Sequence, residues 1–449
     1  MNPPPHPPSR ARTELRHARR PAALSGLALM IGVLLATFAG VAPANAAEDD
    51  ITINVFGTLK NDEKGGEPVP GVTLTATGPD GTSATGETNE RGSFTIEVTV
   101  PAEGGTVSVE LDEGTLPEGV TLREGRPNPL ELSVTPGSSS KAASFPLGAD
   151  NRQVAGKWDR IPQLIYNGLL FGIILALGAL GLSMVFGTTG LTNFSHGELV
   201  TFGALAAFLV NSTFEMPFAV ATVVAVLAGG LLGFLQDRLL WGPLRKRGTG
   251  LIAMMIVSIG LMFLLRNLFQ YFTQGRTQNY REYVTPSGQD FLGITYTVRD
   301  LVMAGVSIVV LVGVTQALSR TRLGRATRAV SDNPALASAT GINVNQVITL
   351  VWVVGGALAA LCGVFLGFTL GVTFTIGQLV LLLLFAAVTV GGLGSIWGAL
   401  LGSLIIGLLI ELSTLVIPSD LKNAGALVLL ALILLLRPQG LLGRKERIG

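Results

Sequence analysis

Hydrophobic and polar positions follow different patterns in two parts of this chain. Between residues 51 and 147, apolar and polar residues alternate in short runs, which is the pattern of half-buried strands. From Ile161 onward, apolar stretches long enough to span a bilayer follow one another. We therefore predict a small all-β domain followed by an all-α polytopic membrane domain.

The alternation is clearest in four segments that turn-forming residues separate, such as Pro79-Asp80-Gly81. Short strands joined by such turns predict a β-sandwich of about 100 residues. We assign residues 47–135 to this domain and residues 136–160, which include three consecutive serines, to a linker. The four predicted strands are residues 51–56, 72–76, 93–98 and 107–111.

The membrane domain, residues 161–449, contains about nine predicted spans. Basic clusters follow the third, fifth and ninth. All of these clusters fall in the cytoplasm if the chain enters from outside, as the positive-inside rule requires. The second and seventh spans are rich in glycine and are candidates for broken or re-entrant helices. The predicted spans lie near residues 162–187, 190–211, 216–241, 251–273, 300–318, 346–372, 376–394, 398–417 and 421–436.

Residues 1–46 have the layout of a secretory signal peptide. Five arginines precede an apolar run from residue 22 to about 41, and Ala44-Asn45-Ala46 is a small-x-small cleavage pattern. The alternative is an uncleaved signal anchor. Both interpretations place residues 47–160 outside the cytoplasm and make the chain a multi-pass protein of the cell (cytoplasmic) membrane.

Composition and charge agree with this division. Hydrophobic residues make up 48% of the chain, charged residues 14%, and the mean hydropathy is +0.53, which excludes a wholly soluble or disordered chain. The net charge is +4 for residues 1–46, −10 for residues 47–157 and +7 for the remainder. A basic leader, an acidic soluble domain and a basic membrane domain follow from these values.

The residues needed for most chemistry are scarce. Outside the leader there is one histidine, His196, and one cysteine, Cys362, so neither a metal cluster nor a nucleophile–base pair can be assembled with confidence. None of the seven lysines lies in a Gly-Lys-Ser/Thr sequence, so the phosphate-binding loop of ATPases is absent. We predict no catalytic residue, no metal, no cofactor and no nucleic-acid partner.

One polar stretch opens the second span. Ser195 and Glu198 have the spacing of a capping box, which would satisfy amides at the helix start. In the other interpretation these groups line a substrate pathway, because polar residues inside a membrane are costly and usually functional. Glu198 is expected near the cytoplasmic end of this span, and Arg266 is expected to extend towards the outer interface. The candidate pathway residues are Asn193, Ser195, His196, Glu198 and Gln378.

A second polar stretch, residues 319–346, forms a predicted cytoplasmic loop. Asn333 is a candidate helix cap, with Pro334 at the first helical position and Gly341 at the end. A short capped helix is a suitable contact for another protein; the alternative is an interfacial helix among topogenic charges. The candidate contact residues are Arg328, Asp332, Asn333, Pro334, Ala337, Gly341 and Ile342.

A weak internal repeat is visible at an offset of 180 residues and includes Phe194/Phe374 and Gly197/Gly377. With nine spans the two copies would be inverted, as in many transporters. Glycines also recur at every fourth position, which favours close helix packing; a conduit wall is the alternative. The candidate packing residues are Gly363 and Gly367 in the sixth span and Gly394, Gly398 and Gly402 at the start of the eighth.

Four segments resemble, in the same order, the signatures of branched-chain amino-acid ABC permeases of the LivH type: residues 181–198, 328–342, 391–399 and 436–443. The resemblance implies a permease subunit that works with a second permease subunit, two ABC ATPase subunits and an extracytoplasmic solute-binding protein. Residues 328–342 would then contact an ATPase. Typical members lack the N-terminal domain, which resembles carboxypeptidase-regulatory-like and Cna-B-like modules.

Other functions remain as alternatives. Related permeases carry urea or short amides. An ion-coupled secondary transporter would need charges near the middle of the spans, and these spans offer few. A receptor or adhesion protein would use the sandwich as its head, but such a protein needs only one span.

Overall fold

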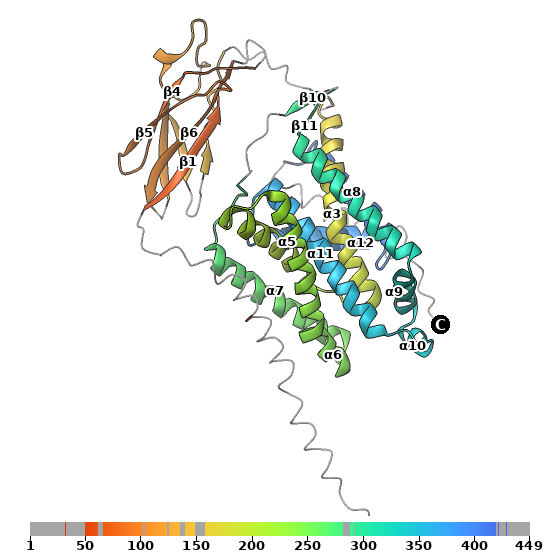
Figure 1. Ribbon diagram of the computed structural model, residues 1–449. Coiled ribbons are helices and arrows are strands. Elements are labelled where there is room, and N and C mark those ends of the chain that lie inside the picture. Colours follow the sequence, from red (N-terminus) through yellow and green to blue (C-terminus); the bar gives the residue numbers. More distant parts are fainter. Residues whose placement is uncertain are drawn as a thin grey trace, which may run out of the picture. The chain divides into compact units, whose positions relative to one another are not determined.

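The computed structural model describes residues 50–61, 66–101, 104–123, 125–134, 140–148, 158–281, 288–291 and 293–418, with single residues 32, 421 and 428 (Figure 1). Apart from those single residues, the predicted signal peptide and the ninth predicted span lie outside the described residues. The chain divides into a β unit, Pro43–Arg160 with Gln270–Gln278, and a helical unit formed by most of the remainder.

The β unit contains two main sheets that share one hydrophobic core. The three-stranded sheet has the order β6-β1-β9, the four-stranded sheet has the order β5-β4-β7-β8, and β2 pairs with β3. The predicted strands coincide with β1, β4, β6 and β7. The strands are β1 (Asp50–Thr58), β2 (Lys60–Asn61), β3 (Glu67–Pro68), β4 (Thr73–Thr77), β5 (Ser83–Glu87), β6 (Ser93–Pro101), β7 (Gly105–Leu111), β8 (Leu130–Val134) and β9 (Ser140–Ala142), and a short 3-10 helix, Glu113–Thr115, follows β7.

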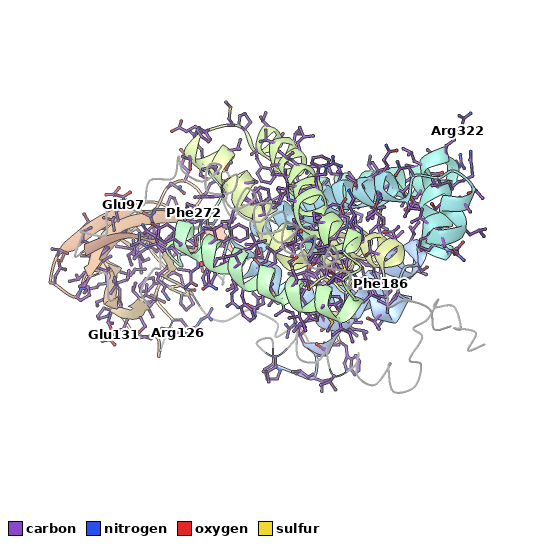
Figure 2. The ribbon with its side chains drawn as sticks, turned by 90° about the horizontal axis from the view of Figure 1, so that it is seen from below. Glu97, Arg126, Glu131, Phe186, Phe272 and Arg322 are labelled. Atoms are coloured by element: carbon purple, nitrogen blue, oxygen red, sulfur yellow. The ribbon has the colours of Figure 1, made fainter. Side chains whose placement is uncertain are left out.

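Alternation of side chains explains this core. In β6, Phe94, Ile96 and Val98 are buried, while Thr95 and Glu97 between them are exposed. Figure 2 labels Glu97 on this strand. Since successive side chains of a strand point to opposite faces, one face of β6 packs inward and the other meets solvent. The β-rich prediction for this region is confirmed.

Within the residues that the structure describes, the helical unit contains six helices long and apolar enough to span a membrane. They correspond to the first, third, fourth, fifth, sixth and eighth predicted spans. The second and seventh are represented by shorter helices, α4 and α12. The helices are α3 (Ile161–Thr189), α4 (His196–Phe208), α5 (Phe218–Gln236), α6 (Gly242–Lys246), α7 (Leu251–Thr273), α8 (Val298–Arg320), α9 (Arg322–Asp332), α10 (Pro334–Ala339), α11 (Val344–Leu370), α12 (Ile376–Gly391) and α13 (Ile396–Ser413), with π-helical turns at Leu209–Thr213 and Asp237–Trp241 and a short hairpin, β10 (Gln289–Phe291) and β11 (Ile294–Tyr296).

The packing of α3, α4 and α5 against α11, α12 and α13 is reciprocal. The first helix of each set packs against the last helix of the other, so α3 contacts α13 and α11 contacts α5. Glycines make both contacts close: a Cβ on Gly168 of α3 would lie 2.9 Å from Leu408 Cα of α13, and one on Gly229 of α5 would lie 2.8 Å from Gly356 O of α11. This exchange is what two internal repeats related by a two-fold axis would produce.

Candidate functional site

Helices α4 and α12 both begin in the interior of the helical unit. The His196 ring donates a hydrogen bond from Nε2–H to Gly178 O of α3 (3.1 Å). Gly178 lies about 16 Å before the end of α3 at 1.5 Å per residue. Glu198 therefore lies near the start of α4, as expected, but well inside the helical unit, because residues 190–195 lead the chain back inward before α4 begins. That this end of α4 is the cytoplasmic one stays a prediction.

The two helix starts meet at a pair of glycines. A Cβ on Gly197 would lie 2.7 Å from Gly377 O, and a Cβ on Gly377 would collide with Gly197 O. The Gly377 amide also donates to Thr201 Oγ1 of α4 (3.2 Å). Because Gly197 and Gly377 correspond at the 180-residue offset, the same position of each repeat touches its counterpart, as residues on a two-fold axis do.

In the turn before α4, the polar side chains bond to each other, which the sequence did not predict. Ser195 does not cap α4; its hydroxyl donates to Asn193 Oδ1 (2.7 Å), which also accepts from the Ser195 amide (3.1 Å). The capping-box interpretation is therefore wrong. The hydroxyls of Thr373 and Thr375 form a similar hydrogen-bonded pair before α12 (3.3 Å). Helices α4 and α12 therefore each begin after a turn whose polar side chains bond to each other.

Several buried polar atoms in this segment have no hydrogen-bond partner. They are Glu198 Oε1 and Oε2, His196 Nδ1 and Asn193 Nδ2, and all three residues are 0% exposed. Thr201 interacts with the Glu198 carboxylate, but the hydroxyl's hydrogen bond goes to Gly197 O (3.4 Å). Gln378, the counterpart of Glu198 in the second repeat, is half-buried on α12. Buried polar atoms of this kind need an explanation, such as a bound water, an ion or a functional role.

Helix α7 contributes two further residues to this crossing. Ser258 Oγ accepts a hydrogen bond from the Phe194 amide (3.1 Å), and the Arg266 guanidinium lies over the Phe374 ring, 5.9 Å from its centroid. Arg266 also attracts the Glu198 carboxylate electrostatically. The expectation that Arg266 extends towards the outer interface stays a prediction. Sequence reasoning missed its role because Arg266 stands alone on an apolar helix.

The segment predicted to contact a partner forms two short helices. Asn333 Oδ1 accepts from the Leu336 amide (3.0 Å) at the start of α10, and Gly341 has a φ of 87° after its end. The amides of Gly341 and Ile342 donate to Ser338 O (3.0 Å) and Ala337 O (3.1 Å), a Schellman motif. Leu336 is 63% exposed, whereas Ala337 is buried.

Helix α9 ties this segment to the rest of the helical unit. Figure 2 labels Arg322, with which α9 begins, and Phe186 near the end of α3. Arg328 donates to Leu318 O (2.5 Å) and Ser319 O (3.3 Å) at the end of α8, and Ser331 Oγ donates to Gly187 O of α3 (2.7 Å). A cleft of about 720 Å³ lies beside these contacts, and Asp332 and Pro334 line it together with residues of the α12–α13 turn.

A buried charged group near the start of α11 was not foreseen. Asp237 Oδ1 accepts from Arg245 Nη2 (2.6 Å), and its Oδ2 accepts from the Thr349 hydroxyl of α11 (2.5 Å). Since α11 follows α10 directly, this group joins α5 to the helix that continues from the exposed segment. Thr349 is 112 positions from Asp237, so no local pattern reveals the group.

The candidate packing glycines all lie at close contacts. On α11, a Cβ on Gly363 would collide with Val200 O, and one on Gly367 would lie 2.8 Å from the Tyr280 hydroxyl. On α13, Gly398 and Gly402 face residues 387–391 of α12. Gly394 differs from the expectation because it lies in the turn before α13 with a φ of 75°, close to Gly187 of α3.

In the described part of the chain, six helices are apolar and long enough to span a membrane, and α4 and α12 begin in the interior beside buried polar groups. These features define a multi-pass membrane protein of the transporter type. Among the described residues no group of three His, Cys, Asp or Glu side chains could hold a metal ion. A family model described as "Branched-chain amino acid transport system / permease component" matches residues 164–436. The chain belongs to this family and is a membrane permease component, not an enzyme.

Individual relatives agree. The chain is 33% identical over 302 residues to the high-affinity branched-chain amino acid transport system permease protein BraD of Pseudomonas aeruginosa, covering 63% of this chain and 96% of the relative. It has the same identity and coverage with LivH of Escherichia coli K12. A probable LivH of Methanocaldococcus jannaschii is 28% identical over 294 residues, covering 63% and 92%.

Proposed function

We propose that this chain is one permease subunit of an ABC importer that moves branched-chain amino acids across the cytoplasmic membrane. The observation that carries the proposal is the meeting of the α4 and α12 starts at Gly197 and Gly377, beside buried and unpaired polar groups. Discontinuous helices whose N-termini face the interior are a common substrate site in transporters. The names of the curated relatives supply the substrate class.

Asn193, Ser195, His196, Glu198 and Gln378 are proposed to line the pathway. The partners are a second permease subunit, two ABC ATPase subunits and an extracytoplasmic solute-binding protein. The ATPase contact is α10 with the end of α9, since the exposed Leu336 offers an apolar side chain on a rigidly capped helix. Membrane lipid surrounds the apolar outer faces of the spans.

The proposed topology places the β unit outside the cytoplasm and residues 320–340 inside. In a Cys362→Ala background, the Ser83→Cys variant is expected to react with a membrane-impermeant maleimide in intact cells. A cysteine at Ser338 is the matched control and is expected to react only after the membrane is opened. Reaction of the Ser338→Cys variant in intact cells would reverse the topology.

The transport assignment is tested with the complete complex in proteoliposomes. We expect ATP-dependent uptake of labelled leucine, reduced about tenfold by Asn193→Ala, because Asn193 Oδ1 accepts two hydrogen bonds that shape the turn before α4. Asn267→Ala is the control, since the Asn267 amide bonds only within α7 at Phe263 O.

Two results would contradict the assignment. Urea uptake in place of leucine uptake would favour the amide-transporting alternative. Leucine uptake that needs an ion gradient and no ATP would favour a secondary transporter.

A further inference from the structure

Two opposite charges, Glu198 on α4 and Arg266 on α7, interact near the start of α12 without forming an ion pair among the described residues. Glu198 on α4 is fully buried and neither carboxylate oxygen has a hydrogen-bond partner. Arg266 on α7 is half-buried and attracts this carboxylate. Within the described part of the chain, no direct ion pair joins the two side chains. The separation leaves both groups able to bind a third group.

Burying two separated charges in a membrane domain costs free energy, so such groups are usually retained for a function. A buried carboxylate without hydrogen bonds loses much of its solvation energy, and a distant arginine recovers only part of it. Ionisable groups inside membrane domains therefore usually mark substrate pathways. The Arg299 guanidinium, which also lies over a phenylalanine (Phe368, 5.0 Å), has Asp300 as an adjacent carboxylate (3.6 Å); Arg266 has no such neighbour among the described ion pairs.

We propose that Glu198 and Arg266 together bind the zwitterionic head group of the transported amino acid, with the ammonium at Glu198 and the carboxylate at Arg266. The inference rests on the proposed function and adds the residues that recognise the head group inside the permease. A free amino acid carries one cationic and one anionic group on adjacent atoms, so it can bridge two opposite charges that do not reach each other. Charge-assisted hydrogen bonds would hold both ends.

Aromatic rings next to these charges suit a branched apolar side chain. Phe374 lies under Arg266, and Phe194 packs against Phe385 with ring centroids 5.3 Å apart. Phe194, Phe374 and Phe385 are each half-buried. Phe194 and Phe374 occupy equivalent positions in the two repeats, so an aromatic ring lies just before the start of α4 and of α12.

The site is closed in this conformation. Glu198 is enclosed, and α7 is joined to the turn before α4 by the hydrogen bond between the Phe194 amide and Ser258 Oγ.

The test measures ligand binding to the complete transporter in lipid nanodiscs without the solute-binding protein. The probes are leucine, leucinol, which lacks the carboxylate, and 4-methylpentanoate, which lacks the ammonium. We expect Arg266→Gln to weaken leucine binding about tenfold and to leave leucinol binding unchanged. Glu198→Gln should weaken leucine binding about tenfold and leave 4-methylpentanoate binding unchanged. The tenfold loss corresponds to one charge-assisted hydrogen bond.

Matched controls are Arg299→Gln and Glu411→Gln, which change an arginine and a glutamate of other spanning helices and should leave leucine binding unchanged. Arg266→Lys keeps the charge and should restore part of the lost affinity, which a misfolded variant would not do. Equal weakening of all three ligands, or of none, in both Gln variants would overturn the inference while leucine uptake still supports the proposed function. A wild-type complex that neither binds nor transports leucine would instead overturn the proposed function.

Discussion

Gly377→Ala is expected to abolish leucine uptake and to lower the thermal stability of the permease. The added Cβ would collide with the carbonyl oxygen of Gly197, a backbone atom that cannot move without shifting α4. Overpacking of this kind costs about 1–3 kcal/mol even in cores that can adjust. Here the displaced parts are the two half-helix starts that carry the polar groups of the pathway, so transport should fall more than stability.

The measurement compares uptake and unfolding temperature with those of Gly305→Ala. Gly305 lies in the middle of α8, and a Cβ there would meet nothing within 4 Å. Alanine is the better helix former, so this control should be neutral or slightly stabilising. A Gly377→Ala protein with wild-type uptake would show that the close crossing is not required for transport.

Gly341→Val is expected to leave membrane insertion intact but to reduce leucine uptake and ATPase association about tenfold. Gly341 ends α10 with a φ of 87°, which a β-branched residue adopts only at a cost of about 1–2 kcal/mol or more. A Cβ there would meet no atom within 4 Å, so the effect arises from backbone strain alone. The strain opposes the Schellman motif and so disturbs the proposed ATPase contact.

Gly248→Val provides a matched control for that strain. Gly248 has a φ of 69°, lies in the loop between α6 and α7, and also has open space around its Cα. If the two variants lose uptake and ATPase association equally, the effect reflects general strain and α10 is not the ATPase contact. Gly341→Asn should retain most activity, because asparagine tolerates a positive φ.

The local patterns of the sequence predicted most of the elements. Alternation in the β region located β1, β4, β6 and β7, since period-two burial depends only on neighbouring side chains. Apolar length located the six helices of spanning length in the described part of the chain. The α10 cap at Asn333 and the helix end at Gly341 were also predicted, because capping is decided within a few residues.

Predictions that depended on position in three dimensions were less successful. Ser195 has the spacing of a capping residue, but its hydroxyl bonds to Asn193 instead, since the turn before α4 is buried and must satisfy its own polar groups. Glu198 was expected near one end of its span, and it lies near the start of α4, but the sequence did not show that this start is in the interior of the helical unit. Residues 190–195 return to the level of Gly178, and that reversal is fixed by the contact between Gly197 and Gly377.

The sequence by itself determined most of the long strands and helices, that the chain enters a membrane several times, and the family resemblance that the permease match over residues 164–436 bears out. Only the tertiary structure decided that the starts of α4 and α12 meet, that Arg266 interacts with Glu198, and that Asp237 joins the end of α5 to α11. The reason is physical: periodicity and capping are properties of neighbouring residues, whereas these contacts join residues that are 60 to 180 positions apart and depend on how closely the helices pack.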